Sequence, residues 1–245
     1  MKRLVILALL LVATTRLYAQ FSDTTNYFVH FGSTGIINNT NETDSYVLNN
    51  TLRFSVYKKR MSLNTTNTWI YGRNQDAITN NDFNASLDFS LFKTFEHFYY
   101  WGLGTFEKSV SLKINHRIQT GLGVGYQLID KPNSLVVVSD GILYEASDLY
   151  DTPETGLDTT YSTYRNSFRV KFRFVFKERV TLDGSNFLQH SLEDRHDYIV
   201  RSQTNLSVKL VKWLSFTTSV TYNKLNTTRR ENLLINFGLS IDKYF

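Results

Sequence analysis

The sequence contains no cysteine and only two prolines, and these absences narrow the class of protein. Without cysteine the chain forms neither a disulfide framework nor a thiolate metal site. Pro132 and Pro153 both fall in breaks between patterned segments. Apart from a short run at the N-terminus, no stretch is long and apolar enough for a membrane-spanning helix, which needs about 20 residues, and none has a 3.6-residue amphipathic repeat. The chain is therefore predicted to be all β.

The N-terminus has the three parts of a secretory signal. A basic start precedes an apolar run from Leu4 to Val12, and Ala19 offers a small residue for cleavage. We predict a signal peptide over residues 1–19 and one domain over residues 20–245. Three of the 27 basic residues and no acid lie in this leader, so the net charge falls from +5 to 24 cations against 22 acids, or +2. This weak charge does not indicate a nucleic-acid partner, which needs a clustered basic face, and we expect none.

The C-terminus alternates between apolar and polar residues up to the last position. A side-chain period of two places the two sets on opposite faces of a strand. The final aromatic is what we expect of a chain that barrel-assembly machinery inserts into the outer membrane. The apolar set is Ile235, Phe237, Leu239, Ile241 and Phe245, and the polar set is Asn236, Gly238, Ser240 and Asp242.

The same alternation recurs along the chain, most clearly over 115–129 and 167–176. Short breaks near residues 58–60, 93–96, 130–133, 177–179 and 211–213 are typical of tight periplasmic turns. Longer polar segments, at 38–45, 73–81, 107–113, 145–159, 189–197 and 224–232, are predicted to be outward loops. Counting strands between breaks gives about twelve, with both termini on the periplasmic side.

A soluble barrel such as a lipocalin also alternates, but its apolar face points inward. Two features favour a membrane barrel. The strands are about ten or more residues long, as a tilted crossing of the bilayer requires, whereas soluble strands average five or six. Twelve strands would also enclose an interior too wide for the apolar residues alone to fill. We predict an all-β, transmembrane, up-and-down antiparallel barrel, integral to a bacterial outer membrane and in contact with its lipids.

The segment from Asn115 to Asp130 contains the pattern Arg-x-x-x-Gly-x-Gly-x-Gly-Tyr-x-Leu-Ile-Asp. With the strand 135–145, the aromatic run 98–101 and the closing segment 235–245, it resembles the family of salt-induced outer-membrane proteins known as domain of unknown function 481. The resemblance implies an integral outer-membrane β-barrel of unassigned activity. It brings no catalytic residues, and no cofactor is expected.

Seven basic residues fall on the polar face of their predicted strands. If this face lines the lumen, two interpretations stand. The cations form an electropositive conduit for small anions, or they pair with acids such as Asp88, Glu145 and Asp183 and plug the barrel. The plug is favoured, because about twelve strands lie between filled eight-strand barrels and open sixteen-strand porins. The seven residues are Arg53, Arg117, Arg169, Lys171, Arg173, Arg201 and Lys209.

Three glycines, Gly121, Gly123 and Gly125, share the polar face of one strand. Their even spacing differs from a phosphate loop, in which glycines turn the chain from a strand into a helix. We predict that they face the lumen and leave room for large side chains from neighbouring strands.

The five histidines raise the alternative of a membrane-embedded lipid-modifying enzyme, which would need a serine beside a histidine. His116 has the lipid-facing parity, while His190 and Ser191 are adjacent and so point to opposite faces. The acidic and histidine residues at 193–197 are interpreted as a solvated loop rather than a metal site. The predicted role is therefore non-enzymatic, either envelope structure and stress adaptation or passive conductance of small solutes.

Overall fold

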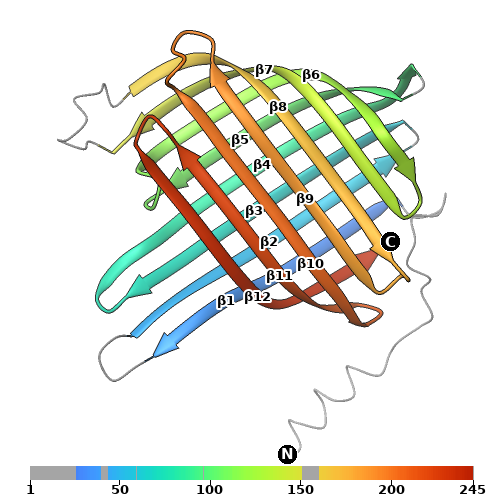
Figure 1. Cartoon of the computed structure of the whole chain (residues 1–245), viewed down its shortest axis with the longest axis horizontal. Helices are drawn as coiled ribbons and strands as arrows, with labels where there is room; N and C mark the ends of the chain where they lie inside the picture. The colour runs from blue at the N-terminus through green and yellow to red at the C-terminus, as the bar shows by residue number, and fades with distance from the viewer. Residues whose placement is uncertain (1–25, 40–43, 59, 96, 151–159, 245) are drawn as a thin grey trace, which may run out of the picture.

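A single antiparallel sheet closes on itself in the computed structural model, which describes residues 26–39, 44–58, 60–95, 97–150 and 160–244. Each strand pairs with its neighbours in sequence, and β1 pairs with β12 to close the barrel (Figure 1). The strands are β1 (Tyr27–Asn39), β2 (Asp44–Lys58), β3 (Met61–Asn74), β4 (Ala77–Phe95), β5 (Phe98–Ser109), β6 (Ile114–Lys131), β7 (Ser134–Leu149), β8 (Thr160–Phe176), β9 (Val180–Ser191), β10 (Tyr198–Val211), β11 (Leu214–Leu225) and β12 (Arg230–Tyr244). The predicted up-and-down barrel of about twelve strands is confirmed.

The apolar face of the sheet points outward. On β6, Ile118 and Leu122 are 51% and 73% exposed, whereas Gln119 between them is 2% exposed. On β12, Ile235 and Phe237 are exposed and Asn236 is buried. This arrangement is inverted relative to a soluble barrel and is the one that a lipid environment requires. The predicted signal peptide and the terminal Phe245 lie outside the described residues. Among the residues that are described, no helix has the length and apolarity to span a bilayer.

Exposed aromatic residues gather near both ends of the outer face, as in the interfacial girdles of membrane barrels. Near the short turns these residues are Tyr27, Phe98, Tyr100, Phe176 and Trp213, and toward the opposite end they include Trp69, Tyr144 and Tyr164. Exposed leucines and isoleucines lie between the two groups. The outer face therefore has the layering of a membrane-spanning surface.

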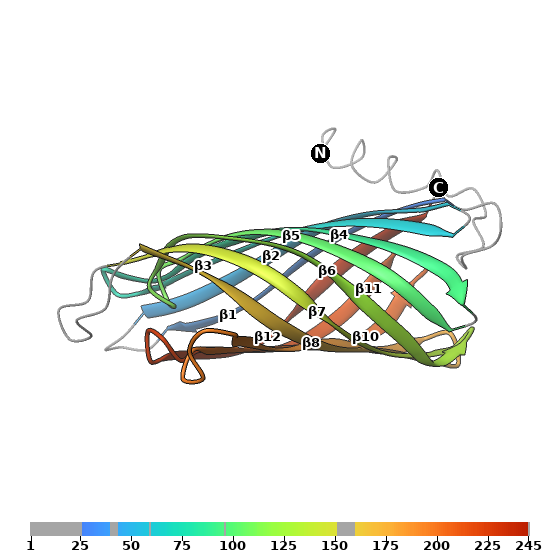
Figure 2. The ribbon, with the colours of Figure 1, turned by 90° about the horizontal axis from the view of Figure 1, so that it is seen from above.

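The two ends of the barrel differ in their connections. The turns after β2, β4, β6, β8 and β10 lie at the end where β1 begins and β12 ends, and we call this the turn end. The opposite end, with the β5–β6, β7–β8, β9–β10 and β11–β12 connections, is the loop end. Seen from above, the barrel is flattened (Figure 2). Two opposite walls of the sheet therefore lie close together.

All six predicted outward loops began too early, and the error is largest at three of them. β5 continues to Ser109, β7 to Leu149 and β9 to Ser191, so Glu107, Glu145 and Gln189 belong to strands and not to loops. Their polarity reflects the inner face of the barrel rather than exposure to bulk water: all three are buried. The strands are consequently 12 to 19 residues long, more than the roughly 9–11 residues that cross the hydrocarbon layer.

Candidate functional site

An ion pair lies at the centre of the loop-end half of the lumen. The guanidinium of Arg165 donates two hydrogen bonds to the carboxylate of Glu145, at 2.8 and 2.9 Å, and both side chains are 0% exposed. Arg165 also donates to Asp197 at 2.6 Å, and Tyr161 donates to Glu145 at 2.9 Å. A buried carboxylate is tolerated only when its charge and its lone pairs are satisfied, and this one is held by a bidentate partner.

The ion pair belongs to a network that spans the lumen. Arg117 lies 3.5 Å from both Glu107 and Glu145, and Arg201 on β10 reaches Glu107 on β5 from the far wall. On another path, Gln119 on β6 donates to Gln189 on β9 at 3.0 Å. Three arginines therefore face three carboxylates, namely Arg117, Arg165 and Arg201 with Glu107, Glu145 and Asp197. The network is electrically neutral, and we call it the polar plug.

An apolar cluster closes the lumen beyond the polar plug. Its members come from both walls and from the β5–β6 turn, and they are only 0 to 6% exposed although they point inward. The cluster consists of Leu112, Ile114, Leu149, Ile199 and Leu225, with Tyr161 packed against it. Because inward-facing side chains next to a water-filled channel would be exposed, their burial means that this level of the barrel is closed.

The β5–β6 turn is held in place over the lumen by hydrogen bonds from two directions. Asp82 on β4 accepts from the hydroxyls of Ser109 and Ser111, at 2.8 and 2.7 Å, and from the Ser111 amide at 3.1 Å. Thr228 in the β11–β12 turn donates to the Leu112 carbonyl at 3.2 Å. The turn therefore bridges two walls, and Asp82 fixes Leu112 within the apolar cluster.

The turn-end half of the lumen differs in charge and in exposure. Asp88 on β4 accepts from Arg169 at 2.6 Å and from Lys171 at 3.3 Å across the barrel. The Lys171 side chain is 38% exposed, and Arg53 on β2, which is half-buried, lies within electrostatic range of it. Inward-facing side chains that are accessible to solvent indicate that water reaches the lumen at this level. We call this part of the lumen the vestibule.

The seven predicted lumen cations thus divide between two environments. Arg117 and Arg201 belong to the polar plug, while Arg169 is buried beside Asp88 at the boundary. Arg53 and Lys171 face the vestibule. Arg173 and Lys209 are exposed nearer the turn end, and neither forms an ion pair with a described residue.

The glycine strip on β6 accommodates large aromatic side chains. A Cβ atom at Gly123 would lie 2.5 Å from the Trp101 ring, and one at Gly125 would lie 2.2 Å from the Tyr99 ring. A Cβ atom at Gly121 would lie 2.5 Å from the Leu143 side chain. These glycines let the rings approach the wall closely, and the Arg169 guanidinium lies over the Trp101 ring, 5.1 Å from its centroid.

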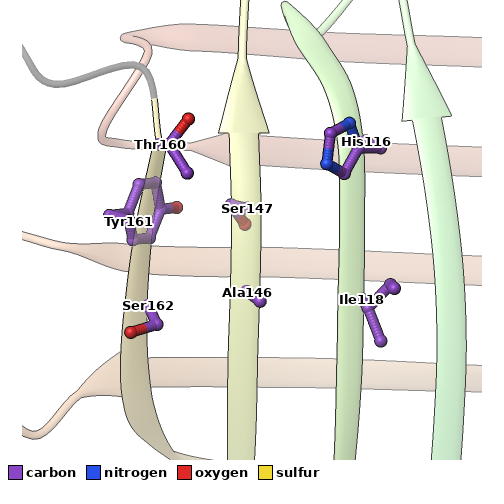
Figure 3. Close-up of a pocket in the computed structure, with 7 residues that line it drawn as sticks. All are labelled: His116, Ile118, Ala146, Ser147, Thr160, Tyr161 and Ser162. Carbon is purple, nitrogen blue, oxygen red and sulfur yellow. The ribbon is translucent and has the colours of Figure 1, made fainter.

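His116 lies on the outer wall near the loop end, beside a pocket of about 410 Å³ formed by β6, β7 and β8 (Figure 3). Its Nδ1 is 3.4 Å from a carboxylate oxygen of Asp148. Ser162 lines the same pocket, but β7 runs between the two residues, because Ala146 pairs with both Ile118 and Ser162. Strands are about 4.8 Å apart, so a hydroxyl two strands away is beyond hydrogen-bond reach of His116.

The other candidate nucleophile is engaged in structure. Ser191 is buried, exchanges a 2.8 Å hydrogen bond with Thr163 and caps the amides of Glu193 and Asp194 at 3.2 Å. His190 points to the outer face and packs against Tyr198. Within the described part of the chain, no group of three or more potential metal ligands occurs.

Sequence reasoning missed Arg165 and the apolar cluster. Arg165 precedes the segment 167–176 in which the alternation is strongest. The cluster did leave a signal: Leu149, Ile199 and Leu225 are apolar residues with the parity of the polar face, and each lies at the loop end of its strand. Ile114 has the parity of the apolar face and lies inside because of the β-bulge between Ile114 and His116. Three such exceptions at one level indicate a seal across the lumen.

Comparison with known proteins assigns the chain to a family. The model of the family described as "Protein of unknown function, DUF481" matches residues 32–236, from β1 to β12. The chain belongs to this family. A search of curated proteins found no match for this DUF481 protein.

Solved structures share the fold of the DUF481 barrel at low sequence identity. The translocator domain of the autotransporter NalP from Neisseria meningitidis is 12% identical, with a TM-score of 0.52, over 98% of this chain and 93% of that one. The NanC porin is 8% identical, with a TM-score of 0.54, over 89% of this chain and 99% of that one. This protein therefore has the fold of outer-membrane β-barrels and resembles porins and autotransporter translocators in that fold.

Proposed function

We propose that this DUF481 protein is an integral barrel of the outer membrane that is closed at rest and contributes to envelope structure. The observation that supports this proposal is the complete burial of Arg165 and Glu145 in the middle of the lumen. A conducting pore keeps water around its charged residues, whereas this pair is dehydrated and neutral. The apolar cluster beyond it adds a second barrier to ions.

The proposal extends to orientation and partners. Short turns and the chain termini face the periplasm in single-chain bacterial barrels, so the turn end is the periplasmic end. The exposed apolar band contacts outer-membrane lipids. Export by the signal over residues 1–19 and insertion by barrel-assembly machinery complete this scheme.

Conductance across a planar bilayer tests the closed state. The protein refolded from residues 20–245 is expected to be silent at 100 mV, because no water path crosses the apolar cluster. The variant Leu112→Ser with Ile114→Ser replaces two members of that cluster by small polar residues while it leaves the outer wall intact. We expect it to open ion-conducting steps.

The control is Ile37→Ser, which repeats one of the two substitutions at a side chain that is 73% exposed at the loop end of β1. It should remain silent. Stable open steps in the parent protein would contradict the closed barrel and would favour passive conductance through a basic lumen.

The lipid-modifying alternative gains no support from the placement of His116 or His190, and it has a direct test. Release of fatty acid from phospholipid vesicles by the refolded parent, if it were lost in His116→Ala, would establish that alternative. We expect no release from either protein.

A further inference from the structure

The vestibule carries more positive than negative charge. Three cations, Arg53, Arg169 and Lys171, face one carboxylate, that of Asp88. This leaves a local charge of about +2, whereas the polar plug is balanced. Arg173 does not change this difference, because Asp183 lies directly opposite it on β9.

The cations differ in how firmly they are held. Arg169 is fixed by Asp88, by a 3.1 Å hydrogen bond to Ser139 and by the Trp101 ring. Lys171 shares Asp88 at the longer distance of 3.3 Å. Arg53 forms no ion pair with a described residue. Of these three cations, Lys171 and Arg53 are thus the two whose charge remains available to a ligand; Arg173 and Lys209 lie nearer the turn end.

The vestibule is accessible from one direction only. Toward the loop end it is blocked by the polar plug, and toward the turn end the inward-facing Arg173 and Lys209 are exposed. Low-dielectric walls concentrate the field of charges that line such a blind recess. A solute therefore meets a positive field that strengthens toward Arg53 and Lys171.

We propose that the vestibule is a binding site, open to the periplasm, for a soluble anion that carries at least two carboxylate or phosphate groups. Arg53 on β2 and Lys171 on β8 each contact one anionic group, and Arg169 holds Asp88 away from the ligand. The proposal rests on the proposed closure of the loop end in one respect only, namely that the anion enters from the turn end. It does not require that the anion crosses the membrane.

Binding of inorganic pyrophosphate and of citrate to the refolded protein in a zwitterionic detergent tests the site by calorimetry. At 20 mM salt we expect saturable binding of one anion per barrel. The variant Arg53→Gln with Lys171→Gln is expected to weaken binding at least about tenfold, since both unneutralised charges are lost. Raising the salt to 0.5 M should also weaken binding, because the charges are accessible to solvent.

The matched control is Lys108→Gln with Arg195→Gln, which removes two exposed positive charges at the loop end. It should bind as the parent does. Loss of heat-modifiable electrophoretic mobility would reveal a misfolded variant, in which case Arg53→Gln alone replaces the double variant.

Absence of saturable binding by the parent would overturn the site, as would equal weakening by the two double variants. These outcomes are distinct from failure of the proposed function. An open parent pore appears as conductance, whether or not the vestibule binds anions.

Discussion

The two halves of the lumen contain similar residues in opposite physical states. At the loop end, Arg165 and Glu145 are completely buried, fully paired and neutral in sum. At the turn end, Lys171 retains 38% exposure of its side chain, and Arg53 has no ion pair with a described residue. The difference shows that charge on the inner face of a barrel does not by itself define a pore: the available acids and the apolar residues beside them decide whether it becomes a seal or a recess.

The sharpest test of this comparison removes one cation from each half. Arg165→Leu leaves Glu145 buried without its bidentate partner, and we expect a loss of about 3–5 kcal/mol of stability. Lys171→Leu removes a solvent-accessible charge and should cost no more than about 1 kcal/mol. Urea unfolding in lipid vesicles, followed by tryptophan fluorescence, measures both.

Arg165→Lys serves as the control for charge alone, because lysine keeps the charge but cannot form the two parallel hydrogen bonds. Its stability should lie between those of the parent and Arg165→Leu. Similar losses for Arg165→Leu and Lys171→Leu would mean that the two halves are equally hydrated.

A second test concerns the wall between the two halves. Gly123→Ala would place its Cβ 2.2 Å from the Asp140 carbonyl oxygen and 2.5 Å from the Trp101 ring, so the wall must shift. We expect a loss of about 1–3 kcal/mol. Gly104→Ala meets no atom within 4 Å and should change stability by less than about 0.5 kcal/mol. Equal effects in the same unfolding assay would show that Trp101 is not packed on the glycine strip.

The smallest expected effect is at the seam where the barrel closes near the turn end. His30 on β1 lies 2.6 Å from Asp242 on β12, and both side chains are half-buried. His30→Ala should cost about 1 kcal/mol, the typical net value of one hydrogen bond. His116→Ala, at a side chain that is 54% exposed, is the control and should be neutral. A larger loss at His30 would mean that the seam, rather than the plug, limits stability.

The sequence predicted the fold because a period of two is a local property. Ile118 and Leu122 on one face and Gln119 on the other can be assigned from neighbours alone, and the structure places them accordingly. The ends of the strands were harder to predict. Near the loop end the inner face carries residues such as Glu107 and Glu145, whose polarity resembles that of a loop.

The partners across the lumen could not be predicted from the sequence. Glu107 and Arg201 are separated by 94 residues, and Asp88 and Arg169 by 81. Alternation shows that each side chain points inward, but it does not show how far away the opposite wall lies. That distance depends on the flattening of the barrel, which brings β5 toward β10 and β4 toward β8.

The order of residues along the chain thus determined the sheet, its closure and the side that faces lipid, because each of these follows from the alternation of side chains within a strand. Only the tertiary structure decided which charges are neutralised and where water enters. Those outcomes depend on contacts between strands on opposite walls, and such contacts exist only once the barrel has closed.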